Sequence, residues 1–207
     1  LLKSLSRLVE LEEGCRITGQ IFVDGEDILP PHVDVNAVRR KMGLLSQKPF
    51  PLPLSIYGNV AYGIRLHYRV SKKELDERVA HYLSEVGLWE EVKHRLKDAA
   101  TALSIGQQQR LCLARGLAVE PEVILCDEPT SALDPLASKK VEELLVKLSD
   151  RYSIILVTHF LRQARKIADY INFIYFGQLV EGGPASQVLD HPRQELTREY
   201  LFGDLGY

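Results

Sequence analysis

Apolar residues recur at helical spacing in several segments of the chain. The segment 136–148 carries four of them at positions i, i+3, i+4 and i+7: Val141, Leu144, Leu145 and Leu148. This spacing predicts an amphipathic helix. A capping box at Ser71–Glu74 predicts the start of another helix, and Gly87 predicts its end. Residues 1–11 are predicted to form the end of a helix, and residues 38–40 to lie in a short polar helix. Further helices are predicted at 107–118 and 162–168.

Short apolar runs predict strands between these helices. Residues 123–126 form one run, and residues 153–157 form a second whose centre is β-branched and fully apolar. Such a centre is typical of a parallel sheet that is covered on both faces. Other strands are predicted at 18–25, closed by an Asp-Gly turn, at 42–46, and in a hairpin over 170–181. Residues 48–54 contain three prolines, which predict a loop.

The order of these elements predicts the fold class. Strands and helices alternate at both ends of the chain, while residues 55–118 are mainly helical. This pattern predicts an α/β core with a helical insertion. We expect a single domain over residues 1–207, with a core at about 1–54 and 119–190, a helical subdomain at about 55–118, and a C-terminal tail at 191–207.

Composition narrows the possible classes of protein. The 207 residues carry a net charge of −2, with 26% charged and 45% hydrophobic residues. This balance is that of an ordinary globular protein, and it gives no basic field that would favour nucleic acid. The apolar runs are of strand length, so no segment is predicted to span a membrane. Cys15, Cys112 and Cys126 are odd in number and show no CxxC spacing, so we expect them to be reduced and buried.

The candidate chemistry begins where the run 123–126 delivers Asp127 and Glu128, and Pro129 then stops the strand. One carboxylate can hold a metal ion while its neighbour acts as a base, which suits hydrolysis of a nucleotide phosphate bound with Mg²⁺. Taken alone, a solvated acidic loop at a strand end is an equally good interpretation.

Two flanking motifs change that balance. The segment Leu103–Arg110, with the sequence LSIGQQQR, lies upstream, and Thr158-His159 follows a second apolar strand. In this order the three elements resemble the ATPase subunits of ATP-binding-cassette (ABC) transporters. The resemblance covers essentially the whole chain. It implies a P-loop NTPase of the ABC type, with a helical insertion and a small antiparallel β part.

The resemblance implies roles for four residues around the two carboxylates. Asp127 would hold Mg²⁺ through water, and Glu128 would polarise the attacking water. Gln47, which matches the family's Q-loop glutamine, would contact both Mg²⁺ and that water. His159 would contact the γ-phosphate of ATP, although a lone histidine is more often structural.

The LSIGQ segment and the residues after the carboxylates match two further family motifs. Ser104, Gly106 and Gln107 would bind the γ-phosphate of an ATP held mainly by a partner subunit, at a helix start that attracts anions. Ile105 replaces a glycine of the family motif, and a β-branched side chain there can block a close approach. Asp134 would lie at the dimer interface, or cap a helix, or do both.

The chain contains no G-x-x-x-x-G-K-[ST] loop, which in this family cradles the phosphates of ATP. We therefore expect the sequence to be truncated at its N-terminus, just after that loop, and to be inactive on its own. The missing loop and Ile105 motivate an alternative, a catalytically degenerate ABC module with a regulatory role or no ATPase role.

Within the family, the chain is most similar to the ATPase subunits of phosphate importers. Three stretches carry this similarity: 47–51 with 55–60, 106–110, and 195–201. It implies the cofactors ATP and Mg²⁺ and a location on the cytoplasmic face of the cell membrane. It also implies transmembrane permease subunits and a second ATPase copy as partners, with a phosphate-binding protein as an indirect partner and no nucleic acid.

Two other classes fit less well. Soluble ABC ATPases of DNA repair or translation typically carry long coiled coils, whereas the helical region here shows no heptads. A dehydrogenase is disfavoured because no G-x-G-x-x-G follows a strand.

Overall fold

The computed structural model describes residues 1–203, which form two compact units. The first unit is Leu1–Val157, and the second begins at Thr158. The last part of the predicted C-terminal tail, 204–207, lies outside the described residues. The predicted division into core, helical subdomain and tail stays a prediction.

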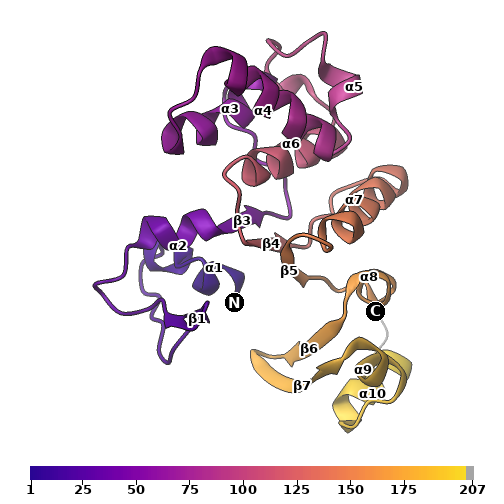
Figure 1. The fold of residues 1–207 in the computed structure, drawn as a ribbon. Coiled ribbons are helices and arrows are strands. Elements are labelled where there is room, and N and C mark those ends of the chain that lie inside the picture. Colours follow the sequence, from indigo (N-terminus) through magenta and orange to yellow (C-terminus); the bar gives the residue numbers. More distant parts are fainter. Residues whose placement is uncertain (204–207) are drawn as a thin grey trace. The chain divides into compact units, whose positions relative to one another are not determined.

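A three-stranded parallel sheet forms the centre of the first unit. Its strands are β3 (Met42–Leu45), β4 (Val123–Asp127) and β5 (Ser153–Val157), and β4 lies in the middle. Figure 1 shows these strands side by side. The parallel sheet predicted from the apolar runs is therefore confirmed, and the fold is of the α/β class.

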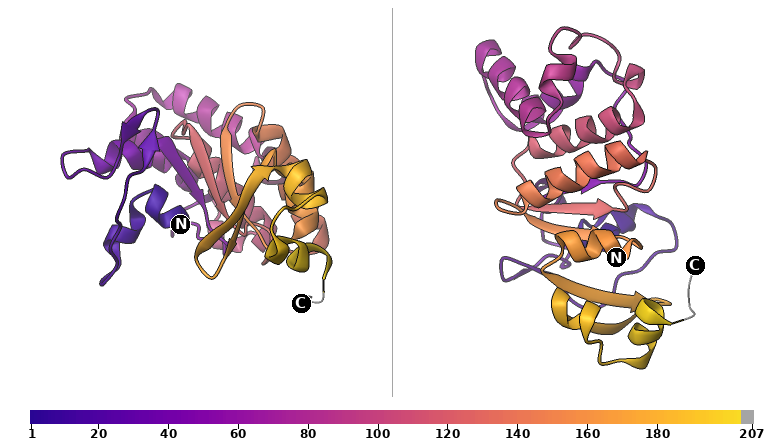
Figure 2. Two further views of the ribbon diagram at one scale, coloured as in Figure 1. Left: turned by 90° about the horizontal axis from the view of Figure 1, so that it is seen from below. Right: turned by 90° about the vertical axis from the view of Figure 1, so that its right-hand side faces the viewer.

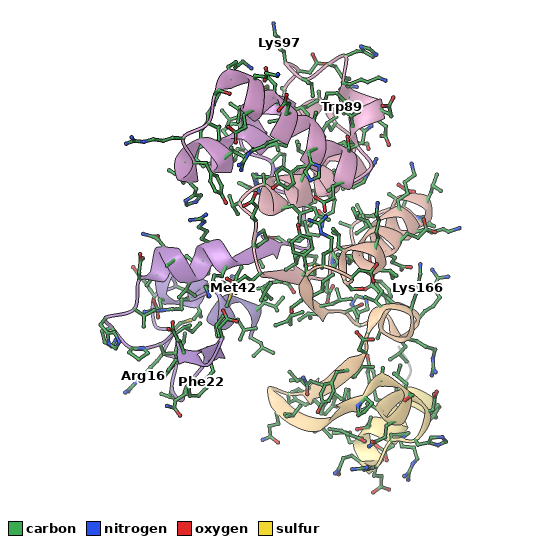
Figure 3. The ribbon with its side chains drawn as sticks, in the orientation of Figure 1. Arg16, Phe22, Met42, Trp89, Lys97 and Lys166 are labelled. Atoms are coloured by element: carbon green, nitrogen blue, oxygen red, sulfur yellow. The ribbon has the colours of Figure 1, made fainter. Side chains whose placement is uncertain are left out.

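Helices cover the two faces of this sheet. Successive residues of a strand point to opposite faces, so Met42 and Leu125 face one way and Gly43 and Ile124 face the other. The first face contributes to a buried hydrophobic cluster that consists of Leu2, Ile28, Val38, Met42 and Leu125. Figure 3 labels Met42. The helices at this face are α1 (Leu2–Leu5) and α2 (Val35–Lys41). The second face packs on α6 (Ile105–Leu117), with α7 (Pro135–Leu148) beside α6, as Figure 2 shows.

The prediction that β5 is covered on both faces is wrong. Its burial alternates, and Ile155 and Val157 are 39% and 37% exposed. Ile155 pairs with Leu125 and therefore lies on the face that α1 covers. Among the described residues, the hydrophobic cluster on this face includes Leu125 but no residue of β5.

The N-terminal segment is less regular than its apolar spacing predicts. The predicted helix is interrupted at Arg7, whose φ of 56° is left-handed, and a 3₁₀ turn, η1 (Leu8–Leu11), follows. Arg7 is buried and donates to the carbonyl of Ile28 at 3.0 Å, so this tertiary contact outweighs the local preference for helix. The strand predicted over 18–25 is likewise shorter. It consists of β1 (Phe22–Val23), paired with β2 (Glu26–Asp27) across the Asp-Gly turn.

The helical part of the first unit lies between β3 and β4. It contains α3 (Ile56–His67), α4 (Lys72–Glu85), α5 (Trp89–Val92), the 3₁₀ turn η2 (Ala100–Ala102) and α6. Ser71 caps α4 as predicted, by accepting a hydrogen bond from the Glu74 N–H. Gly87, with a φ of 63°, lies just after α4, where a left-handed residue commonly ends a helix.

The proline-rich loop between β3 and α3 is held by a buried amide. The side chain of Asn59 accepts from the Leu52 N–H at 2.8 Å and donates to the Ser55 carbonyl at 3.0 Å. Arg115 of α6 donates both to this amide, at 3.2 Å, and to the Phe50 carbonyl, at 3.0 Å. The conformation of the loop is thus fixed by side chains of α3 and α6.

The second unit contains the predicted hairpin. Its strands β6 (Tyr170–Tyr175) and β7 (Gln178–Pro184) pair antiparallel around Phe176 and Gly177. Its helices are α8 (Leu161–Ile167), α9 (Ala185–Asp190) and α10 (Glu195–Phe202). Glu181 of β7 accepts from the backbone N–H groups of Arg193 and Gln194, which ties the start of α10 to the hairpin.

The cysteines differ from expectation at one position. Cys112 and Cys126 are buried, and burial raises the pKa of Cys126 to about 12, so its thiol stays protonated. Cys15 is exposed, so the prediction that all three are buried is wrong. It lies in an irregular segment after η1 that no element covers. Among the described residues, no helix is both long and apolar enough to cross a membrane.

We expect Asn59→Ala to lower the free energy of unfolding by about 2–4 kcal/mol, because the substitution leaves buried backbone groups of the loop without partners. Urea unfolding of the two proteins measures this difference. Asn36→Ala is the matched control, since Asn36 is exposed on α2, and we expect it to change stability by less than about 0.5 kcal/mol. Equal effects of the two substitutions would contradict the assigned role of Asn59.

Candidate functional site

The carboxyl end of β4 presents the two candidate carboxylates in different environments. Asp127 is the last residue of the strand and is exposed. Glu128 follows with a φ of 44°, a left-handed conformation that is rare for a residue with a side chain. Its N–H donates to the Val157 carbonyl at 2.9 Å, and its carbonyl accepts from the Ser131 hydroxyl at 3.0 Å. Strained residues held in this way occur preferentially at functional sites.

Gln47 and Glu128 lie together, as the sequence predicts for two residues of one site. The Gln47 Nε2 donates to the Glu128 Oε2 at 3.2 Å. Gln47 follows β3 and Glu128 follows β4, and these strands are neighbours in the sheet. The carboxylate is therefore oriented by an amide from the adjacent strand end.

Ser104 begins α6 in a complete capping box. Its hydroxyl accepts from the Gln107 N–H at 3.3 Å, and its own N–H donates to the Gln107 Oε1 at 3.0 Å. The capping interpretation of Ser104 is thus confirmed. The remaining N–H groups of the first turn have no partner within the helix and can bind an anion.

Ile105 introduces no strain in the backbone. It occupies the first position of α6, where the backbone is helical, and its side chain is 49% exposed. Its φ is not positive, so a β-branched residue is accommodated there without backbone strain. Any effect of Ile105 on a ligand acts through its exposed side chain.

Asp134 caps α7, as one of its two interpretations predicts. Its Oδ1 accepts from the N–H groups of Leu136 and Ala137, each at 3.0 Å, and Pro135 occupies the first helical position. The motif after the carboxylates is therefore a turn that starts a helix beside α6.

A family model described as ABC transporter matches residues 1–131 of the chain. The chain belongs to the ABC transporter family. The matched segment contains the Gln47–Glu128 pair and the Ser104 cap, so the family is identified on the same residues that build the site. ABC ATPases use ATP with Mg²⁺, and membership gives the chain this class of activity.

A curated relative and two solved structures of ABC proteins are similar over most of the chain. The chain is 51% identical over 206 residues to the phosphate import ATP-binding protein PstB of Thermotoga maritima, which covers 100% of this chain and 82% of the relative. The structure of cbiO1 from Clostridium perfringens, part of the ABC transporter complex cbiONQ, superposes with a TM-score of 0.75 and 24% identity. It covers 90% of this chain and 74% of the other.

The second structure is a dimer of the ATP-binding cassette MJ0796 in a post-hydrolysis state with ADP and Pi bound. It superposes with a TM-score of 0.73 and 28% identity, over 89% of this chain and 78% of the other. Both structures show that the fold predicted for this ABC ATPase is right.

His159 belongs to the second unit of this ABC ATPase, directly after β5. Its imidazole is exposed and lies against the ring of Phe160, with the ring centroids 4.0 Å apart. The neighbouring Thr158 hydroxyl accepts from the Phe160 N–H at 3.0 Å, which shapes the turn into α8. The role of His159 at the γ-phosphate stays a prediction.

Sequence reasoning missed an ion pair that orders the LSIGQ segment. The Gln107 Nε2 donates to a carboxylate oxygen of Glu91 at 2.8 Å, and Arg110, which is buried, donates to the same carboxylate at 2.9 and 3.0 Å. Partial burial acts to raise the pKa of Glu91, but these hydrogen bonds outweigh it and the pKa lies below its ordinary value. Glu91 lies in α5, 16 residues before Gln107, and no spacing in the sequence points to it.

Gly106 permits the close approach of α6 and α7. A Cβ atom at this position would lie 2.7 Å from the Cβ of Ala137, one turn into α7. Since neither atom belongs to a flexible side chain, the two helices would have to separate. The glycine therefore sets the distance between the Ser104 and Asp134 turns.

We expect Gly106→Ala to lower the free energy of unfolding by about 1–3 kcal/mol, through overpacking against Ala137. Gly116→Ala is the matched control in the same helix, because a Cβ there meets nothing within 4 Å. It should raise stability by about 0.5–1 kcal/mol, since alanine favours helix. Urea unfolding measures both changes, and a stabilising Gly106→Ala would contradict the close packing.

The lowered pKa of Glu91 gives a pH dependence of known sign. A carboxylate with a depressed pKa adds stability above its unfolded pKa and loses it as the pH falls through the folded value. We expect Glu91→Gln to be less stable by about 1–2 kcal/mol at pH 7, with the difference shrinking once the pH falls below about 4. Thermal unfolding over a pH series measures this. Glu90→Gln, at an exposed neighbour, should show a smaller difference at every pH.

Proposed function

We propose that the chain is the ATP-binding and ATP-hydrolysing subunit of an ABC importer that drives inorganic phosphate uptake across the cytoplasmic membrane. The observation that carries the proposal is the hydrogen bond from the Gln47 Nε2 to the Glu128 Oε2, at 3.2 Å. It pairs a general base with an orienting amide at the end of the central strand. The 51% identity to a phosphate import protein supports the choice of substrate.

Glu128 acts as the base in the proposed reaction. A carboxylate that accepts a proton from water makes the oxygen a better nucleophile towards the γ-phosphate of ATP. The Gln47 amide fixes the orientation of that carboxylate and offers a carbonyl oxygen on its other side. The hydrogen bonds on either side of the Glu128 backbone keep its side chain from rotating away with the loop.

The donor set suits Mg²⁺. Carboxylate and amide oxygens are hard ligands, and Asp127 and Gln47 present both in exposed positions. Mg²⁺ keeps several waters and needs only one or two protein carboxylates beside the phosphates. This agrees with the finding that the described residues contain no group of three or more His, Cys, Asp or Glu that could hold a metal. When bound, Mg²⁺ neutralises charge on the phosphates of ATP.

The Ser104 turn of one copy serves the ATP of a second copy in this proposal. The first-turn N–H groups of α6 and the Ser104 hydroxyl would meet the γ-phosphate, and Asp134 would lie at the same interface. The His159 of that second copy would contact the same phosphate. In such a homodimer both ATP molecules would be enclosed between the two copies, so that hydrolysis would allow the copies to separate.

The permease would contact the segment from Pro49 to Tyr62, at the cytoplasmic face of the membrane. Exposed aromatic side chains in this segment support such a contact, since Phe50 is 78% exposed and Tyr62 is 52% exposed. The segment leads directly from Gln47 into α3, which gives a short route between the ATP site and the membrane partner. A phosphate-binding protein would deliver the ion to the permease without contacting this subunit.

We expect Glu128→Gln to lower the kcat for ATP hydrolysis by ~100- to 10,000-fold, because the amide cannot accept the proton. ATP binding should persist, since the substitution keeps the shape of the side chain. The measurement is phosphate release and labelled-phosphate uptake by the protein as its gene encodes it, assembled with its membrane partners in vesicles.

Glu143→Gln is the matched control, because Glu143 is exposed on α7 and pairs only with Lys139 among the described residues, at 3.9 Å. It should leave hydrolysis and uptake unchanged. An assembled importer that hydrolyses no ATP with Glu128 intact would favour the degenerate module instead. Uptake of another anion with no uptake of phosphate would refute only the assignment of phosphate as the transported ion, and the ATPase function would stand.

A further inference from the structure

A glutamine on the buried face of α6 contacts the loop that carries Gln47. The Gln109 Nε2 donates to the Ser46 carbonyl at 3.0 Å, and the side chain is only 1% exposed. Ser46 directly precedes Gln47 in the chain. Figure 1 shows α6 between β3 and the helices α3 and α4, in the position from which it can reach this loop.

The contact continues into the candidate site. Gln109 holds the peptide group before Gln47, and the Gln47 amide donates to Glu128 at 3.2 Å. A shift of the Ser46 carbonyl moves the Cα atom of Gln47 with it, because the peptide group is planar and rigid. The position of the Gln47 amide against the carboxylate therefore depends on Gln109.

Core packing does not account for a glutamine at this position. Residues 109, 113 and 117 share one face of α6, and Leu113 and Leu117 are both buried there. Among the described residues, the Gln109 Oε1 has no hydrogen-bond partner. A buried carbonyl oxygen without a partner costs stability, so an apolar side chain of the same length would suit the core better.

The opposite end of this helical segment is the Ser104 cap. Ser104, where the proposed phosphate contact forms, lies five positions before Gln109, at the start of the same rigid helix. A displacement of the helix start is therefore transmitted to the Ser46 carbonyl without passing through a flexible loop.

We propose that Gln109 is a positioning residue for ATP hydrolysis: it holds Gln47 in register with Glu128 and links that pair, through α6, to the Ser104 turn. The proposal rests on the proposed ATPase function. It assigns Gln109 no contact with ATP or with water, and its effect on the rate passes through Gln47.

The test is a double-mutant cycle of Gln109→Met and Gln47→Ala in the assembled importer. Methionine keeps the length of the side chain and removes the donor. We expect Gln109→Met to lower kcat by ~10- to 100-fold, the cost of a small misplacement at a catalytic centre, with the KM for ATP unchanged. The double variant should have the kcat of Gln47→Ala alone, because Gln109 acts only through Gln47.

Gln108→Met is the matched control. Gln108 is the neighbouring glutamine, and its Nε2 donates to the Leu103 carbonyl at 2.8 Å, not to the Gln47 loop. It should change kcat less than Gln109→Met does. The unfolding temperature of both variants is measured beside kcat, so that a loss of fold is distinguished from a displaced Gln47.

Two results would overturn the proposal. The first is additive losses of kcat in the cycle, which would show that Gln109 acts independently of Gln47. The second is an unchanged rate of hydrogen exchange for the amides of residues 46–52 in Gln109→Met, which would show that Gln109 does not hold the loop. The exchange measurement needs no ATPase activity, so it decides on Gln109 even if the importer hydrolyses no ATP and the proposed function fails.

Discussion

The parallel register between β3 and β4 determines the geometry of the site. Leu45 of β3 lies beside Cys126 of β4. Two residues after each of them, Gln47 therefore comes beside Glu128. A slip of one residue would turn every side chain of the strand to the opposite face. The hydrophobic pattern that buries Leu45 and Cys126 therefore also sets which amide meets which carboxylate. The chemistry at this edge of the sheet is a consequence of how its core packs.

The conformation of the segments around this pair depends on hydrogen bonds made by polar side chains of the helical part. Asn59 and Arg115 hold the proline-rich loop after Gln47, and Glu91 holds Gln107 and Arg110 at the start of α6. Asn59 and Arg110 are buried, so each must keep its hydrogen-bond partners or lose stability.

The sequence predicts those elements that depend on interactions between residues close together in the chain. The Ser104 cap, the Asp134 cap and the hairpin around Gly177 are visible in short patterns, and the structure contains all three. The exposure of Ile155 and Val157 in β5 could not be predicted, because it depends on tertiary packing and not on local sequence. The interruption at Arg7 likewise depends on a carbonyl 21 residues away. Gln109 was the one missed residue with a signal: a polar side chain in line with Leu113 on an apolar helix face.

The Ser104 turn and the side chain that contacts the Gln47 loop are therefore parts of one helix. Helix α6 begins at the Ser104 turn, packs closely on α7 at Gly106, and reaches the Gln47 loop with Gln109, about 8 Å further along its axis. Because an α-helix resists bending over so short a length, a ligand that moves its first turn moves the Gln109 amide as well. In the proposed function, contact of the Ser104 turn with a phosphate and orientation of Glu128 would then be linked. The close packing at Gly106 and the hydrogen bond from Gln109 thus connect the Ser104 turn, α7 and the Gln47 loop through one rigid helix.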